Sequence, residues 1–383
     1  MPAVDVRVVV QPEHRASGGR FLHAAVMSLQ TLTPVLGAFP HASLTIVDPE
    51  WGMAPVPAGT LVVLERTPWW SSAASMTPEL ASARAVVRRY WLDVIDVSTL
   101  PPWFVDGLVE YTARSIVAPI FQGSNLGAGY AMLEPRYFGG LVPRSVPIRL
   151  LPESDGEPID AYRASPRVDV TSAAAVDRPS LVAKTVLALN TLERWLNTPV
   201  LDGVLAEFAR AFRHVRPTLA DFMRTASAAS GQDMSWLLAP AFGGNATYDY
   251  AITALSSAPW PGGGFKTTVT AARLGDGLFT GTAAPRIGAF ESGRGLALAT
   301  VFADGECFID RWDGRDATRT FVYRSRAAAV SATIDPDRAL VLDVHRTNNS
   351  RSLAPQSETA ATRWAGRWML WLEHALLTYA MFV

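Results

Sequence analysis

The stretch SARAVVRRYWLDVIDVSTLPPWFVDGLVEY, residues 82–111, holds two helical patterns separated by a pair of prolines. The first pattern starts at Thr77, whose hydroxyl can cap a helix and which is followed by proline at the first helical position, so a helix is predicted over 77–91. The prolines at 101–102 interrupt the periodicity, and a second helix is predicted over 103–113. Because arginines lie in one predicted helix and carboxylates in the next, this helix pair is a candidate functional site.

The composition indicates a globular chain. Of 383 residues, 49% are hydrophobic and 18% charged, which suits about two or three domains with sizeable cores. A formal net charge of −1 gives no electrostatic reason to expect nucleic acid as a partner. The single cysteine, Cys307, excludes an internal disulfide framework and a cysteine-based metal site, and we expect it to be buried beside Phe308.

Targeting signals are weak. The N-terminal segment carries Asp5 and Arg7 within its apolar run and lacks the core of a signal peptide. An uncharged stretch of about 18 residues is missing as well, so no ordinary membrane-spanning helix is expected. The predicted compartment is the cytoplasm.

The patterning predicts an α+β fold in four parts. Strand patterns at 4–10, 43–48 and 60–65, with a helix over 21–36, indicate a mixed α/β lobe over residues 1–76. Helical periods dominate the next part, a helical lobe over 77–258, with further helices predicted at 180–196, 201–212, 218–230 and 233–238. Residues 259–265, PWPGGGF, are expected to be a linker. Alternating short runs then indicate a β-sandwich over 265–350, followed by a C-terminal hydrophobic helix over 361–383.

Five motifs, at 84–91, 103–111, 218–242, 304–323 and 341–352, resemble segments of the membrane alanyl aminopeptidase family of gluzincin zinc peptidases. RAVVRRYW (84–91) resembles its zinc-binding helix, and WFVDGLVEY (103–111) its third-ligand helix. TLADFMRTASAASGQDMSWLLAPAF (218–242) is similar to a late helical segment of the family. DGECFIDRWDGRDATRTFVY and VLDVHRTNNSRS are similar to the β-sandwich of bacterial members. The resemblance implies a thermolysin-like mixed lobe and helical lobe followed by a β-sandwich.

The same comparison implies that the catalytic roles are vacant. The family places His-Glu-x-x-His on the first helix, where this sequence has Arg84, Ala85 and Arg88. Asp106 stands in the position of the ligand glutamate, and Val182 in that of the transition-state tyrosine. Arginine is always cationic and has no lone pair to offer zinc. The substrate loop is matched at best by WGMAP (51–55), without its acidic residue. We therefore expect no metal and no cofactor.

The charged residues leave three structural interpretations open. Arg84 and Arg88 can together hold the Asp106 carboxylate in a buried charge cluster, can be solvated, or can bind an anionic ligand. Glu110, four residues after Asp106, is expected on a solvated face.

Three functional hypotheses follow. The favoured one is a catalytically inactive aminopeptidase-like protein acting as a structural or binding subunit. The others are a zinc-dependent aminopeptidase-type metallopeptidase with an atypical site, and a peptide- or anion-binding module that uses the vestigial cleft.

The C-terminal segment, RWAGRWMLWLEHALLTYAMFV (363–383), is predicted to contact a partner or a membrane. It is too short and interrupted to span a bilayer, yet its tryptophans suit the headgroup region. It can lie in the membrane interface, fill a groove of a membrane-embedded protein partner, or dock on this chain's own domains; we favour an intermolecular contact and a peripheral membrane location. The expected contact residues are Trp364, Trp368, Trp371, Leu372, Leu376, Tyr379 and Phe382.

Overall fold

The computed structural model describes most of the chain as two compact units. The residues described are 3–49, 60–64, 77–122, 156–168, 178–281 and 294–355, with Ala361, Ala365, Trp368, Met369 and Leu372. The first unit comprises residues 1–156, 205–222 and 358–383, and the second comprises 157–204 and 223–357. Helices and sheets occur in largely separate segments, which makes the fold α+β.

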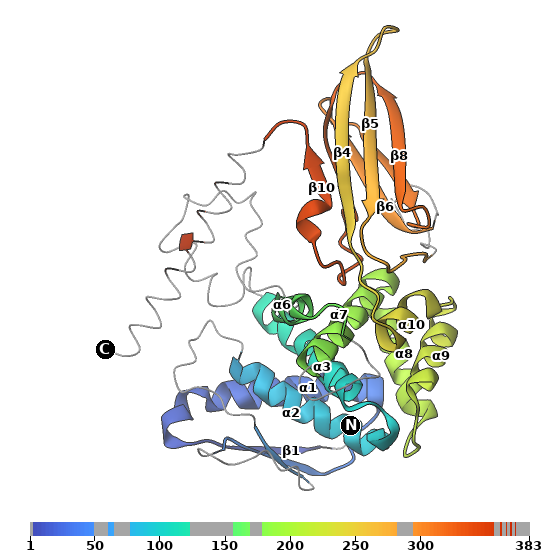
Figure 1. Cartoon of the computed structure of the whole chain (residues 1–383). Coiled ribbons are helices and arrows are strands. Elements are labelled where there is room, and N and C mark those ends of the chain that lie inside the picture. The colour runs from blue at the N-terminus through green and yellow to red at the C-terminus, as the bar shows by residue number, and fades with distance from the viewer. Residues whose placement is uncertain are drawn as a thin grey trace. The chain divides into compact units, whose positions relative to one another are not determined.

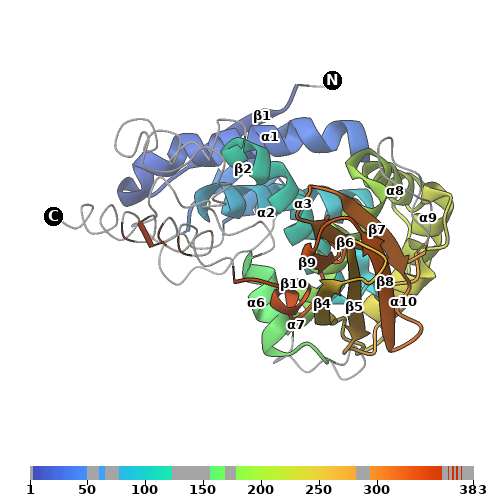
Figure 2. The ribbon, with the colours of Figure 1, turned by 90° about the horizontal axis from the view of Figure 1, so that it is seen from above.

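A small parallel sheet forms the base of the first unit. Strands β1 (Asp5–Val9), β2 (Ser43–Val47) and β3 (Leu61–Val63) lie in the order β1-β2-β3. The 3-10 helix η1 (Pro12–Ser17) and helix α1 (Gly18–Leu36) make the crossover from β1 to β2, as parallel strands require. Helices α1 and α2 lie on one face of the sheet (Figures 1 and 2).

Helices α2 (Thr77–Val94) and α3 (Pro102–Gln122) pack against each other in this unit. The 3-10 turn η2 (Val97–Thr99) and the proline pair separate them, as the sequence predicts. Helix α3 runs nine residues past its predicted end at 113, because buried Ile116 and Val117 continue its apolar face. Phe104 stacks edge-on against Phe222, at 5.1 Å between ring centroids.

The second unit contains a helical layer. It includes α6 (Gly156–Ala164), α7 (Arg178–Leu196) and α10 (Ser235–Gly243), while α8 (Thr198–Ala211) and α9 (Leu219–Ser230) contain the boundary between units. Helix α9 starts with a reciprocal cap. The backbone N–H of Thr218 donates to the Asp221 carboxylate at 2.7 Å, and the N–H of Asp221 donates to the Thr218 hydroxyl at 3.2 Å.

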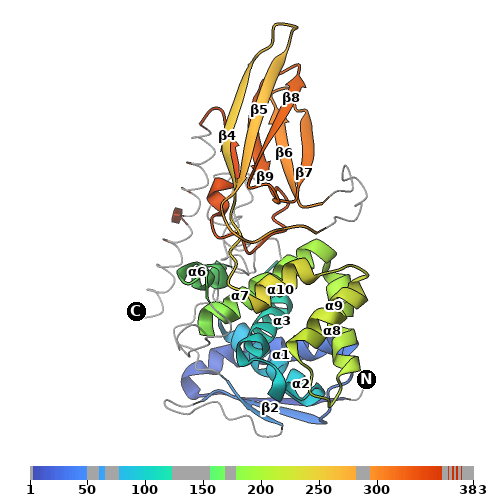
Figure 3. The ribbon, with the colours of Figure 1, turned by 45° about the vertical axis from the view of Figure 1, so that its right-hand side comes forward.

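Two antiparallel sheets of the second unit pack face to face (Figure 3). One has the order β4-β5-β8, formed by β4 (Tyr250–Pro259), β5 (Phe265–Arg273) and β8 (Thr318–Ser325). The other has the order β10-β9-β6-β7, formed by β6 (Leu296–Phe302), β7 (Cys307–Trp312), β9 (Ala329–Ile334) and β10 (Ser350–Ser352), with the 3-10 turn η4 (Arg346–Asn348) before β10. Alternate side chains such as Val269, Phe321 and Leu298 are buried between them.

Two sequence expectations are wrong here. Residues 260–264 make the turn of the β4–β5 hairpin rather than a linker, closed by a 2.9 Å bond from the N–H of Trp260 to the carbonyl of Gly264. A Pro-Gly-rich composition suits a tight turn as well as a linker. Gly264 has φ +77°, and a Cβ there would meet the Ser325 carbonyl at 2.4 Å. Cys307 is exposed rather than buried, because it begins β7 at the edge of its sheet.

Candidate functional site

Charged side chains join α2 to α3 within the first unit. Arg84 and Arg88 are one turn apart on α2, and Asp106 and Glu110 are one turn apart on α3. The Nη2 atom of Arg88 donates to Oδ1 of Asp106 at 2.6 Å. Arg84 donates two hydrogen bonds to Glu110, from Nη2 to Oε1 at 2.7 Å and from Nε to Oε2. The matched spacing on the two helices thus forms a ladder of two ion pairs.

Arg114, one turn beyond Glu110 on α3, adds a second guanidinium to the same carboxylate. Its Nε donates to Oε1 of Glu110 at 2.5 Å, and its side chain is only 8% exposed. The side chain of Glu110 is 14% exposed and that of Arg84 27%, whereas Arg88 is 43% exposed. We refer to Arg84, Arg88, Asp106, Glu110 and Arg114 as the α2–α3 charge cluster.

The electrostatics of the cluster favour the ionised form of Glu110. Burial disfavours the charged form of Glu110, but the hydrogen bonds and charges of Arg84 and Arg114 outweigh it and hold the pKa of this carboxyl below its usual value. A carboxylate in this state is a poor general base, and guanidinium groups donate hydrogen bonds but offer no lone pair. The donor set therefore does not fit a metal ion, and it suits a bridge between two helices.

The remaining candidate ligands are dispersed. In the first unit, His14 contacts Asp48 at 2.6 Å and His41 contacts Asp93 at 2.8 Å. In the second, His345 contacts Asp249 at 2.8 Å. Within the described ranges, histidine, cysteine, aspartate and glutamate form no group of three or more that could hold a metal ion.

The structure settles part of the sequence prediction for this cluster. Of the three interpretations that the sequence leaves open, the charge cluster is the one that the structure shows, with Arg88 bound to Asp106. Arg84 binds Glu110, whereas the sequence analysis expects Glu110 on a solvated face. The i, i+4 spacing shared by the two arginines and the two carboxylates is the sequence signal that could have predicted this pair. Ala85 lies half-buried on α2 with only a methyl group. Val182 lies half-buried on α7, in the second unit. The 51–55 segment lies outside the described residues.

A buried lysine near Val182 also escaped prediction. Lys184 on α7 is 1% exposed, and its Nζ donates to the carbonyl of Gly244 at 2.7 Å, just after α10. Burial lowers its pKa to about 8. Its apolar neighbours Ala183 and Val186 give no local hint that the ammonium would reach a helix end.

The C-terminal segment is described at a few positions. Ala361, Ala365, Trp368, Met369 and Leu372 are helical. Trp368 is 60% exposed and Leu372 53% exposed. None of the helices in the described part of the chain has the length and apolarity needed to cross a membrane. The other expected contact residues lie outside the described residues: Trp364, Trp371, Leu376, Tyr379 and Phe382.

Comparison with known proteins supports the fold class. No family model matches the chain, and no curated protein matches it. Among solved structures, it is similar to the aminopeptidase A of Legionella pneumophila in complex with aspartic acid, with a TM-score of 0.53 and 9% sequence identity. The match covers 88% of this chain and 36% of that chain, so this chain spans about a third of the neighbour's length. At this identity the likeness shows the fold alone, which is aminopeptidase-like.

Proposed function

We propose that this chain is a catalytically inactive aminopeptidase-like protein that serves as a structural or binding subunit of a membrane-associated assembly. The observation that carries the proposal is the α2–α3 charge cluster. By the sequence resemblance, Arg84 and Arg88 correspond to the zinc histidines of that family and Asp106 to its third ligand. In the structure these three side chains belong to ion pairs that join two helices. The aminopeptidase-like fold supports this correspondence of positions.

The chemistry of these side chains supports the proposed absence of that family's zinc chemistry. A zinc ion needs lone-pair donors, whereas both arginines are positive and would repel it. The carboxylate of Asp106 is already held by Arg88, and that of Glu110 by two guanidiniums. Ala85, where the water-activating glutamate belongs, supplies no base. The charged groups of the cluster are thus partners of one another.

Metal content and hydrolysis test this part of the proposal. The protein purified with zinc present should contain no stoichiometric zinc and should not hydrolyse aminoacyl-anilide substrates. The triple variant Arg84→His, Ala85→Glu, Arg88→His should not gain activity, since Val182 supplies no phenol for the transition state. Stoichiometric zinc together with hydrolysis by the parent chain would instead establish the alternative, a metallopeptidase with an atypical site.

The exposed stripe of the C-terminal helix supports the docking role. Positions 361, 365, 368 and 372 are spaced by four, three and four residues, which places them on one helical face. All four are exposed, and all are apolar: Ala361, Ala365, Trp368 and Leu372. Exposed tryptophan and leucine on one stripe suit a membrane interface or an apolar groove of a partner.

Truncation separates an intermolecular helix from an internal one. Deleting residues 361–383 should leave a folded protein that no longer co-fractionates with membranes. The smaller change Trp368→Gln with Leu372→Gln should lower membrane association at least about 100-fold, since burying two such side chains contributes roughly 1.5–3 kcal/mol each. If the helix belongs to the internal core, either change will lower the melting temperature sharply and leave co-fractionation of the folded fraction intact.

A further inference from the structure

The end of the β4–β5 hairpin carries an aromatic ring close to two cations. Lys266 Nζ lies 5.4 Å from the ring centroid of Trp260, and Arg324 Cζ lies 4.8 Å from it. Lys266 on β5 is the direct cross-strand partner of Arg324 on β8, so both side chains share one face of the sheet. Their neighbours Thr267 and Val269 point into the sandwich and are buried, which makes the face of Lys266 and Arg324 the outer one.

The cations of this tip lack acidic partners. Lys266 and Arg324 are both exposed, and across the described ranges neither forms an ion pair. Strands β4, β5 and β8 contain no aspartate or glutamate, although the chain as a whole has a formal net charge of −1. Their basic residues are Lys266, Arg273, Arg319 and Arg324. This sheet is therefore a local concentration of positive charge.

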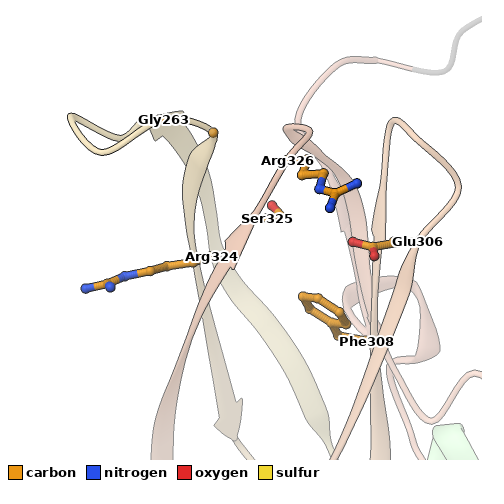
Figure 4. A pocket seen from close by; sticks show the side chains of 7 residues that line it. Gly263, Glu306, Phe308, Arg324, Ser325 and Arg326 are labelled. Carbon is orange, nitrogen blue, oxygen red and sulfur yellow. The ribbon is translucent and has the colours of Figure 1, made fainter.

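A hollow next to the hairpin turn separates two groups of charged side chains. It has a volume of about 480 Å³ and is lined by Gly263, Gly264, Glu306, Phe308, Arg324, Ser325 and Arg326. Arg326 and Glu306 face this hollow, while the guanidinium of Arg324 points away from it (Figure 4). The hollow therefore presents one cation and one carboxylate, whereas Lys266 and Arg324 lie on the outer face of the sheet, near Trp260.

We infer that this tip, formed by Trp260, Lys266 and Arg324, docks on an anionic lipid surface. An indole ring prefers the headgroup depth of a bilayer, and neighbouring lysine and arginine side chains bind lipid phosphates. Exposed Pro261 extends the apolar end of the turn. A protein partner would need roughly 800 Å² on each side, and a hairpin tip of this kind offers far less.

This contact would be separate from the C-terminal helix. The tip belongs to the second unit and the helix to the first. Stable attachment to a bilayer commonly takes two weak signals, and the tip would supply an electrostatic signal in addition to the apolar one proposed for the helix. The inference does not depend on whether the α2–α3 charge cluster is catalytic.

Vesicle co-sedimentation of the full chain tests the inference. Binding to vesicles containing phosphatidylglycerol should exceed binding to phosphatidylcholine alone and should weaken with salt. Each of Lys266→Gln and Arg324→Gln should reduce binding about fivefold, and the double variant on the order of 25-fold, since a cation near an anionic surface contributes about 1 kcal/mol. The matched control is Arg319→Gln, an exposed arginine near the opposite end of β8, which should bind as the parent does.

The helix variant, Trp368→Gln with Leu372→Gln, is measured in parallel to separate the two proposals. If the tip variants lose binding and the helix variant does not, the inference holds and the role proposed for the helix fails. If the tip variants bind like the parent, or if anionic and neutral vesicles bind equally, the inference is overturned whatever the helix does. The inference is also overturned if the parent chain binds RNA or an acidic polypeptide through Lys266 and Arg324 but does not bind anionic vesicles. Trp260→Ala is included when its melting temperature shows that it folds, and otherwise the Gln variants decide.

Discussion

Replacing Glu110 by glutamine should destabilise the first unit. The change keeps the shape of the side chain but removes the negative charge shared by Arg84 and Arg114. Removing one partner of a fully buried ion pair costs about 3–5 kcal/mol, because the other charge is left desolvated. Glu110 and Arg84 are 14% and 27% exposed, so water recovers part of this loss and about 2–3 kcal/mol is expected.

Thermal and urea unfolding measure this loss. For a unit of roughly 150–250 residues, each kcal/mol lowers the melting temperature by about 2–4 °C, which gives a decrease of about 5–10 °C. The difference from the parent should shrink in acid. Because the folded pKa of Glu110 lies below its unfolded value of 4.5, its contribution is full above that value and is lost as pH falls through the folded pKa.

Glu207→Gln on α8 is the matched control. Glu207 also binds an arginine, Arg210, but their side chains are 41% and 74% exposed. Water can solvate the remaining arginine, so the unfolding midpoint should stay at that of the parent. A Glu110→Gln protein as stable as the Glu207→Gln protein would refute the claim that the α2–α3 charge cluster is a desolvated bridge.

Two buried titrating groups of the second unit give opposite pH dependences. The pKa of Lys184 is lowered to about 8 by burial, below its unfolded value of 10.5, so stability should rise by about 3 kcal/mol as pH increases between these values. The substitution Lys184→Met should abolish the rise. The pKa of Asp343 is raised to about 6 by burial and by the charge of Asp249, above its unfolded value of 3.8. Stability should therefore fall as pH rises from about 4 to 6, and Asp343→Asn should remove this dependence. Urea-unfolding midpoints measured across pH test both predictions. If a substitution leaves the pH dependence unchanged, the replaced group does not titrate as described.

Local sequence patterns predicted much of the fold. The break between α2 and α3 follows from prolines that cannot continue a helix, and the strands of the second unit follow from alternation of apolar and polar residues. A contact between arginine and Asp106 was one of three interpretations that the sequence left open, and only the structure shows that Arg88 makes it. The helix break and the strands depend on residues that are close together in the chain.

The sequence by itself determined which side chains are present: Arg84 and Arg88 one helical turn apart, with Ala85 between them. Only the tertiary structure decided which groups lose contact with water. It gave Arg84 the partner Glu110, buried the ammonium of Lys184, and folded 260–264 into a turn. Desolvation depends on segments that are distant in sequence and meet only when the chain packs, so no local pattern records it.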